Sequence, residues 1–221
     1  ELWRGVDHGK DQSYVLFGAT PAQLARTLLP VGRYEKPEIR RIAASIGLAV
    51  HDKPDSQDIC FVPGGDYRRV LQAADPHAMQ PGEIRDGDGR VVGRHDDHEA
   101  FTIGQRRGLN VALGYPIYVV DKDPADNAVT VGPREQLAAS GLAADQVNWL
   151  DERPAASPRR CEVKIRYNAR PTPATVRRTG DDELTVRFDA PQDAVAPGQA
   201  AVCYDGERVL GGGWIREPIR E

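Results

Sequence analysis

The residues with the clearest capacity for chemistry lie in the heptapeptide DSQDICF, residues 55–61, where Cys60 stands between a polar loop and an apolar run. A cysteine can act as a nucleophile or carry sulfur, but its thiolate forms readily only beside positive charge or a helix N-terminus. Asp55 and Asp58 work against the thiolate, and Lys53 is the one close cation in the sequence. On the residues alone a small, buried hydrophobic role is favoured for Cys60, and a reactive thiol stays open as the alternative.

A second candidate is the basic stretch at residues 158–178, which holds seven basic residues and one acid. Side chains alternate between the two faces of a strand, so we expect an apolar face and a cationic face. The apolar face is predicted to hold Cys161, Val163, Ile165 and Tyr167, and the opposite face Glu162, Lys164 and Arg166. Such a cationic face fits a phosphate backbone, and a solvated strand face is an equal alternative.

Four further patterns are weaker. GVDHGKD, residues 5–11, is one residue short of a Walker phosphate loop and has Asp where Ser or Thr would bind magnesium. The three glycines at 211–213 follow a predicted strand, which favours a bulge or a close backbone approach over a phosphate cradle. HDDH, residues 95–98, is interpreted as a solvated turn rather than a metal site, because no third element of known metal spacing accompanies it. Arg106 and Arg107 could contact phosphate, and a plain charged turn is an equal alternative.

The elements that must position these residues change in character along the chain. Residues 20–30, TPAQLARTLLP, open with the Thr, Pro and Gln pattern of a capped helix. Residues 36–47, KPEIRRIAASIG, place isoleucines along one stripe and end in glycine, which predicts a second helix. LAVHDK, residues 48–53, is a candidate short strand.

From about residue 79 the pattern becomes that of β structure. Residues 81–93 and 117–132 have turn residues between apolar runs and are predicted hairpins, the second turning at residues 124–127. The last part of the chain reads as short antiparallel strands, which indicates a small barrel. These strands are CEVKIRY, ATVRR, ELTVRF, AAVCYDG and RVLGGGWI, and the expected joint before them is the Pro- and Ala-rich segment 151–158.

Composition limits the remaining possibilities. The 221 residues, of which 40% are hydrophobic and 28% charged, are typical of a soluble globular protein with one large domain or two to three small ones. Three widely spaced cysteines without a C-x-x-C pair argue against a disulfide framework or structural zinc and favour a reducing cytoplasm. No apolar run is long enough to span a membrane, and the net charge of −4 does not decide for or against nucleic acid. The first residue is Glu1 rather than Met, which indicates a processed or truncated chain.

Taken together, the motifs of this chain resemble the tRNA-specific 2-thiouridylases, which place sulfur at C2 of the wobble uridine of certain tRNAs. The resemblance runs from about Gly9 to Ile215 and rests on many ordered matches rather than on one motif. The matching motifs are GKDQSY, LLPVGRYEKPEIRRIA, DSQDICF, FTIGQRRGL, YVVDKD, VKIRY, PGQAAVCYDG and LGGGWI.

The resemblance implies that Cys60 carries a persulfide during turnover. In the family, ATP adenylates the C2 oxygen of uridine, and the terminal persulfide sulfur replaces that oxygen as AMP leaves. The resemblance also implies tRNA contacts at Lys10, Asp11, Gln12, Arg166, Tyr167 and Gln199. It further implies a disulfide bond, a persulfide donor (a relay protein or a cysteine desulfurase), a cytoplasmic location without a membrane partner, and magnesium only as a companion of ATP.

Two features of the family are missing from these residues: the S-G-G-x-D-S loop that binds ATP pyrophosphate, and a second catalytic cysteine with a nearby Asp. The fold implied is multi-domain α/β plus β. We expect the end of a Rossmann-like PP-loop domain at residues 1–75, a small mostly β central domain at 76–155, and an antiparallel β-barrel that contacts tRNA at 156–221. An enzyme of the transferase class is implied, with this chain inactive by itself. The alternative is a tRNA-binding β module or fragment without activity of its own.

Overall fold

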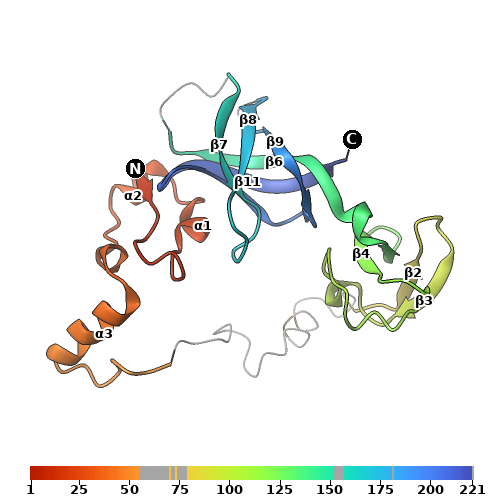
Figure 1. Cartoon of the computed structure of the whole chain (residues 1–221), viewed down its shortest axis with the longest axis horizontal. Helices are drawn as coiled ribbons and strands as arrows, with labels where there is room; N and C mark the ends of the chain where they lie inside the picture. Colours follow the sequence, from red (N-terminus) through yellow and green to blue (C-terminus); the bar gives the residue numbers. More distant parts are fainter. Residues whose placement is uncertain (55–69, 71–72, 74–78, 152–156, 181, 221) are drawn as a thin grey trace. The chain divides into compact units, whose positions relative to one another are not determined.

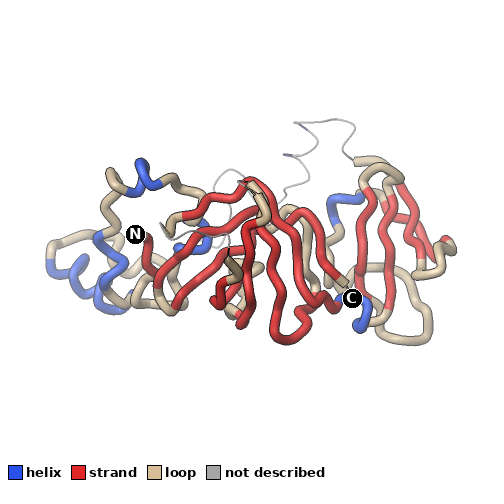
Figure 2. The backbone as a smooth tube through the Cα atoms, turned by 90° about the horizontal axis from the view of Figure 1, so that it is seen from above, coloured by secondary structure: helices blue, strands red, loops and turns tan. Residues whose placement is uncertain are grey.

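A computed structural model describes residues 1–221 except for 55–69, 71–72, 74–78, 152–156, 181 and 221. Strands predominate over helices (Figure 2). The chain forms two compact units, one made of residues 1–53 and 139–221 and the other of residues 54–138. None of the described helices is long and apolar enough to cross a membrane.

The first unit is built on a closed antiparallel barrel, as the sequence predicts (Figure 1). Its strands are β6 (Ala138–Trp149), β7 (Arg159–Lys164), β8 (Thr172–Arg178), β9 (Leu184–Asp193), β10 (Ala200–Asp205) and β11 (Arg208–Ile219). They follow one another in the order β11-β10-β7-β8-β9-β6, and pairing of β6 with β11 closes the barrel. The two-residue strand β1 (Leu2–Trp3) extends the sheet beside β11.

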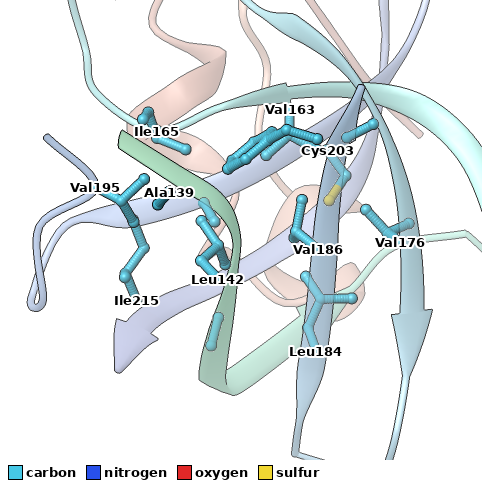
Figure 3. Packing of buried hydrophobic residues seen from close by; sticks show 14 of the residues in the cluster. Ala139, Leu142, Val163, Ile165, Val176, Leu184, Val186, Val195, Cys203 and Ile215 are labelled. Atoms are coloured by element: carbon cyan, nitrogen blue, oxygen red, sulfur yellow. The ribbon is translucent and has the colours of Figure 1, made fainter. Parts of the chain in front are cut away.

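Alternation along these strands sends every second side chain into the barrel. Leu142, Leu184 and Val186 point into this interior in Figure 3, and each is at most 1% exposed. Val163 and Ile165 belong to the same cluster, and the half-buried Cys161 packs against it. The apolar face predicted for β7 is therefore confirmed at these three positions.

The glycines at 211–213 mark a close approach of backbones, as the sequence predicts. A Cβ at any of these positions would lie no more than 2.7 Å from a carbonyl oxygen of a neighbouring strand. Gly211 also has φ +138°, where the β10–β11 register shifts. Strand β11 is paired on both sides at this point, by β10 and by β6, so only glycine fits.

The barrel begins earlier in the chain than expected. Strand β6 starts at Ala138, whereas the sequence places residues 138–149 in a central domain and starts the barrel at 156. The strand is hard to recognise because its pattern is irregular: its pairing with β11 shifts register twice. Residues 1–53 belong to the same compact unit as the barrel.

The N-terminal segment contains short helices: α1 (Ser13–Leu16), α2 (Pro21–Leu24), the 3₁₀ helix η1 (Pro30–Arg33) and α3 (Lys36–Ser45). The capped start of α2 is confirmed, because Gln23 N donates to Thr20 Oγ1 and Thr20 N donates to Gln23 Oε1. Helix α3 ends before Gly47 with φ +78°, as predicted. The strand expected at residues 48–53 is wrong: this segment forms turns, and no described residue of 4–53 is in a strand.

The second unit contains β2 (Gly82–Arg85), β3 (Val91–His95), β4 (Tyr118–Asp123) and β5 (Ala128–Gly132), with the 3₁₀ helices η3 (His98–Ala100) and η4 (Arg134–Leu137). Both predicted hairpins form, β2–β3 and β4–β5. A parallel pairing of β2 with β5 joins them into one sheet in the order β3-β2-β5-β4.

The interpretation of HDDH as a solvated turn is wrong. His95, Asp97 and His98 are each at most 5% exposed, and only Asp96 of the four is exposed. The His95 ring lies 5.5 Å from the Phe101 ring and bonds the carbonyl of Asn127, and burial lowers the pKa of its imidazole. Among the described residues no group of three or more His, Cys, Asp or Glu side chains could hold a metal ion.

Candidate nucleic-acid interface

The candidate site lies where the turn before α1 meets the outer face of the barrel. Successive residues of β10 point alternately inward and outward, and both faces of the strand are buried. The outward side chains Ala200, Val202 and Tyr204 form a second apolar cluster with Tyr14 and Phe17 of the α1 segment. Tyr14 also donates a 2.9 Å hydrogen bond to the carbonyl of Ala200, which fixes α1 against the barrel.

Asp11 holds the turn before α1 from within. It is 9% exposed, and its carboxylate accepts hydrogen bonds from the backbone N–H of Gly5 and Ser13 and from the Ser13 hydroxyl. The Ser13 hydroxyl in turn lies 3.2 Å from the Tyr204 hydroxyl, on the barrel. The neighbours Lys10 and Gln12 are both exposed, so the buried carboxylate sets the positions of two outward side chains.

Gln12 meets Tyr167 across 155 residues of sequence. The Gln12 side-chain amide donates a 2.5 Å hydrogen bond to the Tyr167 hydroxyl. Tyr167 lies in the turn after β7, where the alternation of strand side chains no longer applies. The prediction that it faces inward is wrong, because its side chain is 40% exposed. Its ring contacts Tyr14 edge to face, with centroids 6.2 Å apart. Two elements that the sequence presents separately therefore share one surface.

Lys164, the last residue of β7, completes this cluster. Its ammonium lies 5.5 Å from the centroid of the Tyr14 ring and 5.6 Å from that of Tyr167. Burial lowers the pKa of the Lys164 ammonium below its usual value. The Asp11 carboxylate opposes this shift, and the Arg4 guanidinium adds to it. Strand alternation places Lys164 on the cationic face predicted from the sequence, although the family resemblance does not assign it a tRNA contact. Tyr14 lies within the GKDQSY motif but is not among the residues that the sequence assigns to the site.

Arg166 and Gln199 lie in the turns that flank this cluster. Arg166 is half-buried and donates a 2.8 Å hydrogen bond to the carbonyl of Ala194, beyond β9. Its positive charge also acts on the phenol of Tyr14 and lowers the pKa that burial raises. Gln199 is exposed, and it immediately precedes Ala200, whose carbonyl binds Tyr14. Gly198 at φ +80° makes this turn possible.

The remaining basic residues of 158–178 are not equivalent to these. Arg159 forms ion pairs with Asp151 and Asp205, and Arg160 forms one with Asp189. These two cations are thus compensated by carboxylates, whereas Lys164 lies against the rings of Tyr14 and Tyr167.

The cysteines fall into two groups. Cys60 and its motif lie outside the described residues. Cys161 and Cys203 are free thiols of the barrel, and Cys203 is completely buried. A hydrogen bond with Cys161 and burial raise the pKa of the Cys203 thiol well above its usual range. A thiol in that state is a poor nucleophile, which agrees with the packing role expected from the sequence.

Arg106 and Arg107 belong to the second unit and are exposed in a firmly built loop. The backbones of Gly104 and Gln105 bond that of Val119, and the Gln105 amide donates to the Arg107 carbonyl. These hydrogen bonds hold the loop that carries the two exposed arginines. The arrangement is compatible with both alternatives for the loop, a phosphate contact and a charged turn.

Three family models match consecutive parts of the chain. Residues 1–64 match the tRNA methyl transferase HUP domain, residues 71–133 the tRNA methyl transferase PRC-barrel domain, and residues 139–215 the aminomethyltransferase β-barrel domain.

Relatives that match nearly the whole chain carry the name tRNA-specific 2-thiouridylase MnmA. The protein of Rhodopirellula baltica is 51% identical over 99% of this chain and 56% of its own length. That of Heliobacterium modesticaldum is 50% identical over 97% of this chain and 56% of its own length. That of Chloroflexus aggregans is 48% identical over 99% of this chain and 61% of its own length. The chain thus spans little more than half the length of these relatives, and it belongs to the tRNA-specific 2-thiouridylase family.

Proposed function

We propose that this chain is the part of a tRNA 2-thiouridylase that carries sulfur on Cys60 and grips tRNA with the surface around Tyr167. The observation that carries the proposal is the hydrogen bond from Gln12 to Tyr167. It joins the two elements whose motifs match the family's tRNA-contacting positions. The names of the relatives, at 48–51% identity, support the same activity.

The proposed contacts divide by exposure. Lys10 and Arg166 bind phosphate oxygens, Gln12 and Gln199 offer amides to base or ribose edges, and Tyr167 stacks on an unpaired base. Asp11 has a different role, because its carboxylate is buried and accepts three hydrogen bonds from its own turn. It holds Lys10 and Gln12 in place.

The proposed reaction begins with attack of the uridine C2 oxygen on ATP, which releases pyrophosphate and makes adenylate the leaving group. The terminal sulfur of the Cys60 persulfide then attacks C2, and AMP leaves with the oxygen. A thiol must next attack the sulfur of Cys60. That step forms a disulfide with Cys60 and leaves the second sulfur on C2 of the uridine. A reducing thiol then restores Cys60, and a relay protein or a cysteine desulfurase reloads it with sulfur.

We propose that the 221 residues bind tRNA and accept sulfur without completing the reaction. They contain no S-G-G-x-D-S sequence for ATP and its magnesium. Cys203 is buried with a raised thiol pKa, so it does not suit the attacking thiol of the third step. The reaction is proposed to take place in the cytoplasm, the location that the cysteine pattern and the family resemblance indicate.

The sulfur-carrying role is tested by intact mass spectrometry after incubation with a cysteine desulfurase and free cysteine. We expect the chain to gain one sulfur atom on Cys60, and the Cys60→Ser variant to gain none. Sulfur on Cys161 or Cys203 with Cys60 unmodified would contradict the assignment.

The tRNA-gripping role is tested by binding of unmodified tRNA at two salt concentrations. We expect Arg166→Ala to weaken binding by about 1–2 kcal/mol, the scale of a charge-assisted contact. The matched control is Arg177→Ala, which removes the same charge from an exposed position on β8 and should leave affinity unchanged. Equal affinities for the chain and Arg166→Ala at both salt concentrations would remove Arg166 from the site. Binding without any sulfur loading would favour the alternative, a tRNA-binding module without chemistry.

A further inference from the structure

We propose that Lys164 is a positioning residue: it backs the ring of Tyr167 and holds it in the orientation that stacks on an RNA base. This inference rests on the proposed function of the same surface. The geometry behind it is one ammonium shared by two rings, 5.5 Å from Tyr14 and 5.6 Å from Tyr167. Both distances fall within the range of an attractive cation–π contact.

The path of the Lys164 side chain supports a role inside the surface rather than above it. On β7 it alternates with the inward-facing Val163, so it leaves the barrel on the outer face. Its register partner on β10 is Val202, a fully buried member of the cluster under α1. The aliphatic stem of Lys164 therefore lies against apolar surface, and its ammonium reaches the tyrosines.

Tyr167 is restrained from three directions although it is 40% exposed. Gln12 binds its hydroxyl, Tyr14 meets its ring edge to face, and Lys164 lies over the ring. A large exposed side chain normally loses rotamer freedom when it binds a ligand, and that loss weakens affinity. The three contacts remove much of this freedom before RNA arrives.

The alternative is that Lys164 itself binds a phosphate, and the salt dependence of affinity separates the two roles. Each phosphate contact contributes about 0.7–0.9 to the slope of log Kd against log salt concentration. A lysine that binds phosphate takes that contribution away when it is neutralised. Neutralising a lysine that only orients a tyrosine lowers affinity and leaves the slope unchanged.

The experiment measures tRNA binding over a salt series for the chain, Lys164→Met, Lys164→Arg and Lys10→Met. We expect Lys164→Met to raise Kd about three- to tenfold with an unchanged slope, given the strength of stacking and of cation–π contacts. Lys164→Arg should largely restore affinity, because arginine keeps the cation over the rings. Lys10→Met is the matched control at an exposed lysine, and it should reduce the slope.

A double-mutant cycle gives the sharpest comparison. If Lys164 acts through Tyr167, Lys164→Met has no further effect in the Tyr167→Ala background. Additive losses, or a reduced slope in Lys164→Met, would overturn the inference and leave the proposed function intact.

A readout without RNA keeps the two proposals separate. We expect the aromatic NMR signals of the Tyr167 ring to shift in Lys164→Met and to return toward their original positions in Lys164→Arg. If the unmodified chain binds no tRNA, the proposed function fails, and the ring signals still report on the contact. Unchanged ring signals in a folded Lys164→Met, or in Lys164→Gln if the methionine variant does not fold, would show that Lys164 does not position Tyr167.

Discussion

The barrel and the segment at residues 20–53 belong to one compact unit. The barrel buries its apolar side chains, whereas the segment leaves many of its apolar side chains exposed. In the barrel Leu142, Val186 and Leu210 are completely buried. In the segment, α3 has no buried residue at all, and Leu28 is 90% and Ile46 67% exposed.

The two regions differ in what determines their structure, which is burial in one and local sequence signals in the other. Strand β10 is defined by burial on both faces, from the barrel interior and from α1. The segment is defined by local signals: a capping box at Thr20, proline near the start of α3 and glycine after its end. Local signals are worth little free energy compared with burial. An exposed apolar stripe of this kind is typical of a surface that another chain or domain covers.

The largest effect expected from this contrast is on global stability. Leu142→Ala should lower the free energy of unfolding by about 2–5 kcal/mol, because it empties space in a closed core. Ile46→Ala removes an equally apolar side chain from an exposed position and should change stability by less than about 0.5 kcal/mol. Urea denaturation followed by tryptophan fluorescence measures both. Equal losses would mean that the stripe of α3 is covered in solution and that the contrast is false.

An intermediate effect concerns the cluster between α1 and β10. Burial raises the pKa of Tyr204 from 10.0 to about 12. The folded chain therefore keeps the phenol proton in a pH range where the unfolded chain has lost it. Stability should be complete below pH 10 and fall as the pH rises from 10 toward 12, by about 1–3 kcal/mol.

Denaturation curves across that pH range test this expectation against Tyr204→Phe. The phenylalanine variant lacks the titrating group, so its stability should have the shallower pH dependence. Parallel curves for the two proteins would show that Tyr204 is not shielded from water as the structure describes.

The smallest effect is expected at a single local signal, the cap of α2. Thr20→Ala removes the cap of α2 and should cost that helix about 0.5–1 kcal/mol. The matched control is Thr27→Ala, whose hydroxyl binds the Gln23 carbonyl without capping a helix start. Amide hydrogen exchange should show faster exchange in α2 for Thr20→Ala only, with β10 unchanged in both. Faster exchange in β10 would indicate that the segment and the barrel unfold as one body.

Local pattern is sufficient for much of this fold. The two hairpins of the second unit, five barrel strands, the capped start of α2 and the glycine end of α3 follow from alternation and turn residues. The failures share a cause, because each depends on contacts that local pattern does not contain. The polar residues of HDDH indicate a solvated turn, but His95 is buried against Phe101 and bonds the carbonyl of Asn127. Strand β6 escapes recognition because its two register shifts disturb its alternation.

The candidate site divides in the same way. Each of its motifs, from GKDQSY to VKIRY, is a continuous stretch of the chain. The sequence by itself therefore determines the family and names the residues proposed to contact tRNA. Tertiary structure alone decided that Gln12 binds Tyr167, that Asp11 faces inward, and that Lys164 lies between two tyrosine rings. The contacts of Gln12 and Tyr14 with Tyr167 and Lys164 join residues far apart in the chain, and they form because β7 pairs with β10, against which Tyr14 and Phe17 pack.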